Sequence, residues 1–462
     1  MHDDNELIPV RPIPLRDYPR PLSLLWKLRK DLLSIWPESA YREQFFGGPV
    51  MRQHMYVANS PDTVEHVLVR NNDIYQRKSP YMRKALQPLL GDGLFASDGE
   101  TWRNRRTLEQ PAFQSTHLKR YAGVMTTVVA ETCQRWHREH VGRQINVLPE
   151  MAWLTAEIIS QAMFDYPLGM DKAKKIVSGF ADFQASVEQF DPAAFFGWPD
   201  WLPGMPQRRR ASRQAGVIHR IVEDIITAGQ QGTGNEQGLL ALLLAAHNST
   251  QPPGISLEQI RNEAVVILMA GHETTANSLA WAIYLISRSP RVELKLLEEL
   301  ATVLGGRPAE FEDVSRLKYT RAIFEEAMRL YPPVPILSRE ALAEDTIRDR
   351  HIPKGSIMLV VPWLLHRHED LWERPHHFIP ERFTSEWPSR QQKYGYIPFS
   401  AGPRICLGAA FGMMEAIICL ATIMQQFSLK SPANTEPGYE CRLTLRPAGG
   451  LPMMVNRRRE FS

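Results

Sequence analysis

The sequence predicts a mainly α-helical protein with small peripheral β-sheets. From Glu100 onward helical patterns dominate, and the strongest of them cover Leu257–Ser289 and Leu407–Phe427. Strand-type residues are confined to a stretch near the N-terminus and to Ile336–Val361 and Cys441–Val455. The expected architecture is therefore one helical body flanked by small sheets.

The composition is typical of a globular protein. Of 462 residues, 44% are hydrophobic and 23% are charged, which suits a chain with a substantial core. The formal net charge is only +3 and the basic residues form no single dominant block, so we expect no nucleic-acid partner. Four scattered cysteines are too few for a disulfide framework, which favours a reducing compartment and makes the cytoplasm the expected location.

We expect residues 1–462 to form a single domain, with about residues 1–49 as an N-terminal lead. The acidic start does not resemble a signal peptide, and the longest apolar runs are far shorter than the ~20 residues that span a bilayer, so we expect no transmembrane anchor. Within the lead, Leu24–Trp36 has the spacing of an amphipathic helix. Docking against the protein's own body is the commoner fate of such a helix, and association with a membrane surface is the alternative.

The N-terminal region predicts a small sheet followed by a helix. Val50–Val57 contains strand-type residues, and Ser60-Pro61-Asp62 opens a helix that runs toward Arg70. Farther along the chain, turn residues predict two loops between helices, at Asp191–Gln207 and His247–Gly254.

The helix Leu257–Ser289 is the longest that the sequence predicts. Ser256 and Gln259 form a capping box at its start, and Pro290 follows its end. At 1.5 Å per residue it would be roughly 50 Å long. Its centre, Ala264–Ala270, is apolar on all sides, so we expect it to be buried.

Polar residues interrupt this helix where it should be buried, at positions 271–275. They are costly there unless they have partners or a purpose, and a packed polar network is one interpretation. In the other, the Thr274 hydroxyl donates to the carbonyl of Ala270 and opens a groove for dioxygen and water. Ala270 and Gly271 would form its small wall, and Glu273 would connect it to solvent protons.

Cys406 stands at the start of the last long helical pattern. The helix dipole and the free backbone N–H groups at such a position favour the thiolate, which prepares the sulfur to bind a metal. Gly402 permits a tight turn, Gly408 allows the close approach of a flat ligand, and Arg404 supplies a cation. For the remaining three cysteines we favour the role of a small buried hydrophobic residue.

The segment around this cysteine matches F-x-x-G-x-R-x-C-x-G at every fixed position. Those positions are occupied by Phe399, Gly402, Arg404, Cys406 and Gly408. The chain here resembles the cytochrome P-450 superfamily of haem-thiolate monooxygenases, of the soluble prokaryotic type, and the likeness extends from about Val50 to the C-terminus. It implies haem b with Cys406 as the axial ligand of the iron, an α-rich prism with a peripheral β subdomain, and Arg404 beside a haem propionate. Gly412 departs from the usual alanine of the pattern, whereas the family's glutamate is present at Glu415.

Two further motifs of the family follow in its order. Glu273 and Thr274 match A-G-x-[DE]-T-[TS], in which an acid and an alcohol support proton delivery to dioxygen. Glu326 and Arg329, three apart on one helix, together with Arg382 of a Pro-Glu-Arg-Phe segment, resemble the structural triad behind the haem.

Other residues are assigned to the cofactor and the substrate by resemblance. Trp102 and Arg106 match W-x-x-x-[RH], whose members contact haem propionates, and we expect the same of Arg339; a basic surface helix is the alternative for the first pair. The expected wall of the substrate pocket is formed by Phe95, Ala270, Val334, Ile336 and Leu337. These residues are apolar, so we expect a hydrophobic substrate.

The resemblance implies a reaction that places one oxygen atom of O2 in a bound substrate, most often by C–H hydroxylation of a fatty acid, terpene or steroid-like molecule. Electrons are expected from a separate protein, a small acidic ferredoxin with its reductase, or else a flavodoxin or diflavin reductase. We expect a monomer that docks its donor on a basic cluster, which consists of Arg103, Arg105, Arg106, Lys119 and Arg120. A haem-thiolate sensor or carrier is a rival hypothesis, but it has no need of Glu273 and Thr274. A peroxygenase or isomerase of the same fold often replaces both.

Overall fold

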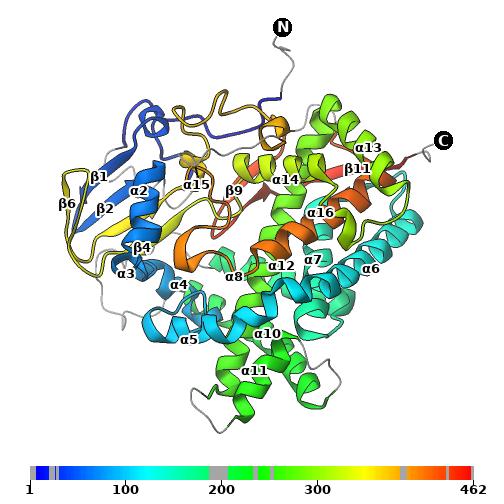
Figure 1. The fold of residues 1–462 in the computed structure, drawn as a ribbon, viewed down its shortest axis with the longest axis horizontal. Coiled ribbons are helices and arrows are strands. Elements are labelled where there is room, and N and C mark those ends of the chain that lie inside the picture. Colours follow the sequence, from blue (N-terminus) through cyan, green and yellow to red (C-terminus); the bar gives the residue numbers. More distant parts are fainter. Residues whose placement is uncertain are drawn as a thin grey trace.

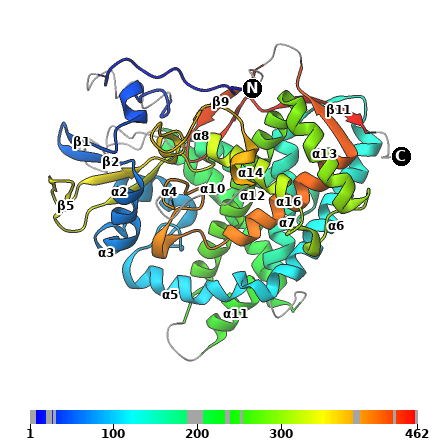
Figure 2. The ribbon, with the colours of Figure 1, turned by 45° about the horizontal axis from the view of Figure 1, so that its top comes forward.

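The computed structural model describes residues 7–19, 27, 31–186, 206–232, 238–249, 254–384, 393–432 and 436–458. Helices form most of this part of the chain, and small sheets lie around them (Figure 1, Figure 2). The predicted fold class, mainly α with small sheets, is confirmed.

Helix α12 (Leu257–Arg288) runs through the middle of the molecule and packs against α7 (Val147–Phe164), α14 (Lys318–Leu330) and α16 (Ala409–Gln426) (Figure 1). The other helices are α2 (Pro61–Glu65), α3 (Asn72–Tyr75), α4 (Pro80–Leu90), α5 (Gly99–Glu109), α6 (Ser115–Glu139), α8 (Gly169–Ser186), α10 (Pro206–Gln230), α11 (Leu239–Asn248), α13 (Pro290–Leu304) and α15 (Pro362–Leu365). Short 3-10 or π turns are η1 (Glu38–Tyr41), η2 (His66–Arg70), η3 (Gln110–Phe113), η4 (Phe311–Asp313), η5 (Pro380–Phe383) and η7 (Gly402–Arg404).

The start of α12 is fixed by the predicted capping box. The Ser256 hydroxyl accepts from the N–H of Gln259 at 3.2 Å, and the Gln259 side chain accepts from the N–H of Ser256 at 2.9 Å. From Ala264 to Met269 every side chain is buried, as the all-round apolar pattern predicts. The helix therefore forms the central support on which the site is built.

The main sheet joins the N-terminal region to a segment 300 positions later. Its strand order is β1 (Phe45–Val50), β2 (Gln53–Ala58), β7 (Ile357–Val360) and β4 (Leu337–Glu340). Strands β2 and β7 are parallel, with Met55 opposite Ile357, and the other pairs are antiparallel. The smaller sheets comprise β3 (Gln144–Asn146), β11 (Pro452–Arg457) and β8 (Phe427–Lys430), then β9 (Gly438–Cys441) with β10 (Leu445–Ala448), and β5 (Asp345–Ile347) with β6 (Arg350–Ile352).

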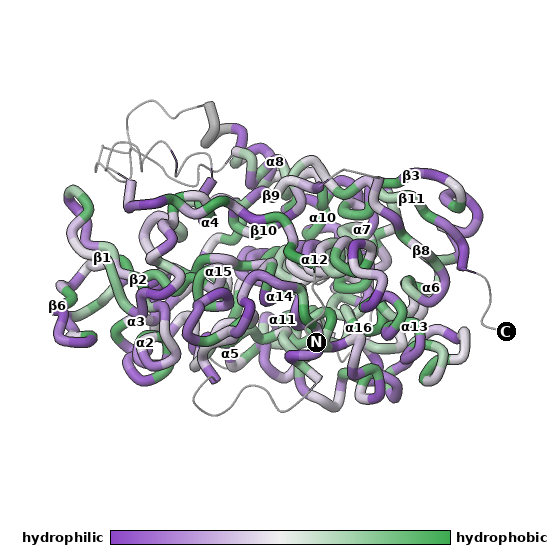
Figure 3. The backbone as a smooth tube through the Cα atoms, turned by 90° about the horizontal axis from the view of Figure 1, so that it is seen from above, coloured by the Kyte–Doolittle hydropathy of each residue, from purple (hydrophilic) through white to green (hydrophobic). Residues whose placement is uncertain are grey.

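The helices and the main sheet have separate apolar cores. One cluster of buried residues fills the helical body, and a second lies beside the main sheet and includes Tyr56, Val67 and Met358. Hydrophobic stretches run along the central helices, whereas the edge of the molecule at β6 is hydrophilic (Figure 3). The segment 399–408, which carries Cys406 and which we call the cysteine loop, contributes Ala401 to the second cluster. The loop therefore lies between the two cores.

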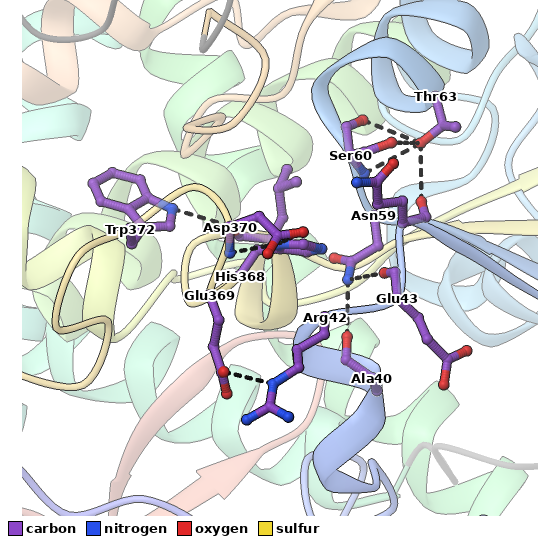
Figure 4. A network of polar contacts seen from close by, with 12 residues as sticks. Ala40, Arg42, Glu43, Asn59, Ser60, Thr63, His368, Glu369, Asp370 and Trp372 are labelled. Carbon is purple, nitrogen blue, oxygen red and sulfur yellow. Dashed lines mark hydrogen bonds and ion pairs between the residues drawn. The ribbon is translucent and has the colours of Figure 1, made fainter.

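A polar network fastens the N-terminal segment to the chain after α15 (Figure 4). The buried Asn59 amide donates to the carbonyls of Ala40 and Glu43, each at 2.9 Å. Arg42 donates from Nε to Glu369 at 2.6 Å. The main sheet is thereby held against the helical body.

Two segments predicted near the N-terminus and before α10 differ from the structure or lie largely outside its described residues. The predicted helix Leu24–Trp36 is wrong over Asp31–Trp36, which forms bends and turns, because Leu33 and Trp36 are buried against other parts of the chain. Residues 24–26 and 28–30 lie outside the described part. The predicted loop Asp191–Gln207 also lies outside it, except for the start of α10 at Pro206.

Among the described residues, α16 is the one helix that is long and apolar enough to cross a membrane. However, 72% of it is buried inside the molecule, where it packs against α6, α12 and α14. Burial of this kind is typical of a core helix.

Candidate active site

The cysteine loop makes a tight turn that leaves Cys406 three residues before α16. The Cys406 N–H donates to the carbonyl of Phe399 at 2.9 Å, and the N–H of Ile405 donates to Gly402 at 3.0 Å. Gly402 has a φ of +72°, and a Cβ there would collide with the carbonyl oxygen of Leu68. The turn predicted at this position therefore requires glycine.

The Cys406 side chain is accessible to solvent, unlike the buried Cys133, Cys419 and Cys441. Burial raises the pKa of its thiol, while the N–H of Gly408 and the Arg106 guanidinium act in the opposite direction. The prediction that the helix start alone favours the thiolate is therefore wrong in its net direction. The thiol needs a bound cation to lose its proton near neutral pH.

Three cations converge near this loop without a matching carboxylate. Burial lowers the pKa of Arg339 to about 10 and, together with Arg339, that of Arg404 to about 9. Burial followed by both arginines holds the pKa of Lys78 well below its ordinary value. Within the described residues, no carboxylate forms an ion pair with any of the three. Buried cations of this kind call for a ligand that carries negative charges.

Helix α5 borders the same loop. The Arg404 guanidinium lies 5.0 Å from the ring centroid of Trp102 and donates to the carbonyl of Ser97 at 2.7 Å. Arg106 donates to the carbonyl of Ile405 at 2.9 Å, directly beside the cysteine. The structure thus brings Trp102, Arg106 and Arg404 together, as the motifs require.

Helix α12 is continuous through positions 271–275, where the sequence predicted an opening, and it carries the predicted side-chain hydrogen bond there. Thr274 Oγ1 donates to the carbonyl of Ala270 at 2.7 Å, which confirms this hydrogen bond, and Ala270 is exposed although the helix around it is buried. Gly271 does not belong to this groove. A Cβ at Gly271 would lie 2.7 Å from Ile159 of α7, so the role predicted for it is corrected to the packing of two helices.

The acid next to this alcohol is buried. The Glu273 carboxylate accepts from the side-chain amide of Gln184 in α8 at 2.7 Å, and Arg446 and Thr444 near the start of β10 also face it. Burial raises the pKa of Glu273 to about 7, against smaller opposing effects of Arg446, Thr444 and Gln184. Near neutral pH this side chain can therefore either hold or release a proton.

Residues 30–451 match the sequence model of the family described as Cytochrome P450. The chain belongs to this family. Cyclooctatin synthase of Streptomyces melanosporofaciens is 32% identical over 410 residues, which cover 86% of either chain. Pentalenene oxygenase of Streptomyces avermitilis is 27% identical, over 84% of this chain and 83% of the relative. Cytochrome P450 4V2 of Mus musculus is 29% identical, over 89% and 82%.

The protein therefore has the cytochrome P450 fold, is a P450 monooxygenase and uses haem with a cysteine thiolate as axial ligand. The residues present fit this cofactor: an accessible thiol lies near three buried or half-buried cations that form no ion pair with a carboxylate among the described residues. Lys78 is the member that sequence reasoning missed, because no motif of the sequence includes it. Its burial beside Arg339 and Arg404 follows only from the fold.

The Glu-x-x-Arg pair of this P450 is fully buried. Arg329 donates from Nε and Nη2 to the two oxygens of Glu326 at 2.6 and 2.7 Å, and Arg382 Nε lies 3.6 Å from Glu326. The remaining donors of Arg329 reach the carbonyls of His366, Pro375 and His377 at 2.7–2.9 Å. The geometry is that of a structural fastening between α14 and the segment before η5.

The residues predicted to line the pocket do not all share one side. Phe95 and Ile336 pack against the core of the helical body, whereas Leu337 packs against the cluster beside the main sheet. Val334 is half-buried. The ammonium of Lys78 lies 3.8 Å from the ring centroid of Phe95, so the aromatic residue is adjacent to the cationic cluster. Leu337 thus packs in a different apolar cluster from Phe95 and Ile336, with which it was predicted to line the pocket.

Proposed function

We propose that this P450 hydroxylates an unactivated C–H bond of a hydrophobic small molecule, such as a fatty acid, terpene or steroid-like compound. The observation that carries the proposal is the pairing of Thr274 and Glu273. The half-buried Thr274 hydroxyl is bonded to the carbonyl of Ala270 in α12, and the neighbouring acid has a pKa of about 7. Oxygen activation needs protons delivered one at a time, and this arrangement suits that task.

In the proposed site Cys406 holds the haem iron, and the bound haem supplies the oxidising chemistry. Arg404, Arg339 and Lys78 bind the propionates, since no carboxylate of the described residues forms an ion pair with them and only Asp98 opposes the lowered pKa of Arg404. Arg106 completes the set beside the thiolate.

Proton transfer is proposed to run through Glu273 and Thr274. Glu273 takes a proton from the side of Arg446 and Glu440, which form an ion pair at 2.7 Å and are partly exposed. The Thr274 hydroxyl is anchored by the carbonyl of Ala270, which leaves its oxygen free to accept a hydrogen bond in the groove. Glu273 and Thr274 are neighbours in the chain, so the proposed proton donor and acceptor lie on the same turn of α12.

The hydrophobic substrate is supported by the side chains proposed to border the groove. Phe95, Ala270, Val334 and Ile336 carry no charge and no hydrogen-bonding group, so an apolar molecule loses least on entering. One relative is named for the oxygenation of pentalenene, another for the synthesis of cyclooctatin.

Electrons are proposed to come from a small acidic ferredoxin with its reductase. The basic cluster expected to dock it is smaller than the sequence indicated, because Arg105 is buried against Glu263, Lys119 pairs with Glu312 and Arg120 pairs with Asp165. Arg103 on α5 remains exposed and, with Arg106, forms the remaining basic part of this face. We further propose a single haem domain that acts as a cytoplasmic monomer.

The proposal is tested with Thr274→Ala and the matched Thr274→Ser. With a surrogate ferredoxin and a hydrophobic substrate that is turned over, product per electron should fall roughly tenfold or more in the alanine variant and hydrogen peroxide should rise, because proton delivery is lost. The serine variant should keep most of the coupling, since it retains the hydroxyl. Equal coupling in all three proteins would show that Thr274 has no such role.

A further inference from the structure

Two buried carboxyl groups meet on the side of α12 that faces α5. Glu263 of α12 and Glu109 of α5 are both fully buried. Arg105, one helical turn before Glu109 on α5, lies 3.0 Å from Glu263, so the two carboxyls belong to the same contact between the helices. Neither oxygen of Glu109 has an N–H donor among the residues that the structure describes. Two buried carboxyls that face each other repel when both are charged, and burial together with the charge of Glu263 raises the pKa of Glu109, so we infer that the pair holds one proton.

One buried arginine balances the remaining charge. Arg105 Nε lies 3.0 Å from Glu263 Oε1, and the arginine side chain is 9% exposed. Asp92 is 3.7 Å from the same guanidinium but is about half exposed, so solvent screens it. With one shared proton, the two glutamates and Arg105 together are neutral.

Few other charged groups face the pair. Arg106, the neighbour of Arg105 on α5, acts on Glu109. Helix α11 packs against both α5 and α12 and contributes only His247, whose Nδ1 lies 2.7 Å from the carbonyl of Ile255. The protonation of the pair is therefore governed by the two carboxyls and by Arg105, Arg106 and Asp92.

The pair holds the loop that precedes α5, which we define as Gly91–Ser97. The second oxygen of Glu263 accepts from the N–H of Leu94 at 2.7 Å. The carbonyl of Leu94 accepts from Arg404 at 3.4 Å, and that of Ser97 does so at 2.7 Å. The loop is thus gripped by α12 on one side and by the cysteine loop on the other.

Helix α12 makes a second contact with this loop. Asn262, adjacent to Glu263, donates to the side chain of Asp92 at 3.0 Å. Leu94 is buried, and Phe95 follows it directly in the chain. A displacement of the Leu94 backbone therefore moves Phe95.

We propose that Glu263 and Glu109 are positioning residues, whose shared proton holds the Gly91–Ser97 loop, and with it Phe95, in place at the substrate pocket. The inference rests on the proposed function in taking Phe95 as part of that pocket. Removal of the proton leaves a second negative charge in a buried place, so the two side chains separate and the grip on Leu94 weakens.

The direction of the pH effect follows from Glu109. Burial, and after it the charge of Glu263, raise the pKa of Glu109 well above its ordinary value. The pair is therefore complete at low pH and is lost as the pH rises through this raised pKa. Ordering of the loop should decline in the same direction.

Hydrogen–deuterium exchange of the haem-loaded protein tests the grip directly, with rates for a peptide that covers residues 91–97 corrected for the intrinsic effect of pH. In the wild type, protection should fall as the pH rises. Glu109→Gln keeps a neutral donor beside Glu263, so protection should become independent of pH. Glu263→Gln should lose protection roughly tenfold or more at every pH, because a charged acceptor is removed. Glu100→Gln, on the exposed face of α5, is the matched control and should behave as the wild type.

A second readout concerns the pocket. Absorbance titrations with imidazole and with 4-phenylimidazole compare a small haem ligand with one that reaches the pocket wall. The ratio of the two dissociation constants should change with pH in the wild type and stay constant in Glu109→Gln. A structural role alone would move both ligands together.

The proposal is overturned if Glu109→Gln keeps the wild-type pH dependence or if Glu263→Gln leaves the loop protected. A carbon monoxide difference spectrum of each variant separates this result from the proposed function. A normal thiolate band with an unchanged loop contradicts only the positioning role, whereas the absence of that band in the wild type contradicts the haem site itself.

Discussion

At the scale of single residues, the chemistry depends on a few polar groups that are costly to bury. Glu273 illustrates this, because burial moves its pKa from the ordinary carboxyl range to about 7. An exposed acid on the same helix, Glu258, has a side chain that is 75% exposed and pairs only with Arg261. The comparison separates the carboxyl that we propose for proton transfer from one at the surface.

We expect product per electron to be highest below about pH 7 and to fall above it, because the raised pKa of Glu273 keeps the carboxyl protonated only on the acidic side. Glu273→Gln should lower coupling and flatten this profile. Glu258→Gln, the control, should leave it unchanged. Coupling assays across the pH range decide the matter, and an equal decline in Glu273→Gln would assign the titration to another group.

Contacts between residues that are close in the chain could be predicted from the sequence. The hydrogen bond from Thr274 to Ala270 spans one helical turn, so the helix prediction already contained it. Lys78 could not be found in this way, because its proximity to Arg339 and Arg404 comes from three separate segments. The net pKa of Cys406 was mispredicted for a similar reason, since burial outweighs the local effect of the backbone N–H.

At the scale of elements, the position of α12 depends on its close contact with α7. Gly271 lies directly against α7, where an added Cβ would be 2.7 and 2.8 Å from two carbons of Ile159. In contrast, Gly123 of α6 has no atom within 4 Å of such a Cβ. The same substitution should therefore have opposite effects in the two helices.

Gly271→Ala should lower the free energy of unfolding by about 1–3 kcal/mol, because the added methyl overpacks the contact. Gly123→Ala should raise it by about 0.5–1 kcal/mol through helix propensity alone. In the double variant Gly271→Ala with Ile159→Ala, the loss should be smaller than the sum of the single losses. Denaturant titrations measure the wild type, the three single variants and the double variant, and additive effects would mean that the two residues do not clash.

Elements with local boundary signals could be predicted, and those without them could not. Ser256 and Gln259 identify the start of α12 because a capping box is a local feature. Over Asp31–Trp36 the helical spacing is misleading, since Leu33 and Trp36 are buried by tertiary contacts in a turn. Helical spacing indicates which side chains are buried, but side chains in a turn can be buried at the same spacing.

At the scale of the whole molecule, distant segments are fastened by buried charge. Arg329 joins Glu326 of its own helix to three carbonyls of the segment 366–377, and both side chains are fully buried. The parallel pairing of β2 with β7 makes a similar long connection. No local sequence pattern identifies the carbonyls that Arg329 binds or the strand that pairs with β2. The strand order therefore could not be derived from the sequence.

Arg329→Ala should cost about 3–5 kcal/mol of unfolding free energy, because it leaves Glu326 charged and buried without its partner. Arg329→Lys should restore little, since one ammonium cannot replace a guanidinium that binds a carboxylate and three carbonyls. Arg321→Ala on the same helix removes a partly exposed pair, in which Arg321 is 57% and Glu325 18% exposed, and should cost only about 1 kcal/mol. Unfolding followed by helix content and haem absorbance checks this, and equal losses for Arg329→Ala and Arg321→Ala would contradict the fastening.

The central claim is that Cys406 binds the haem iron as a thiolate, and the carbon monoxide difference spectrum of the reduced protein tests it most directly. We predict a strongly red-shifted Soret band in the wild type and its loss in Cys406→Ser. A wild-type band at the ordinary haem position, or a red-shifted band that persists in Cys406→Ser, would contradict the assignment.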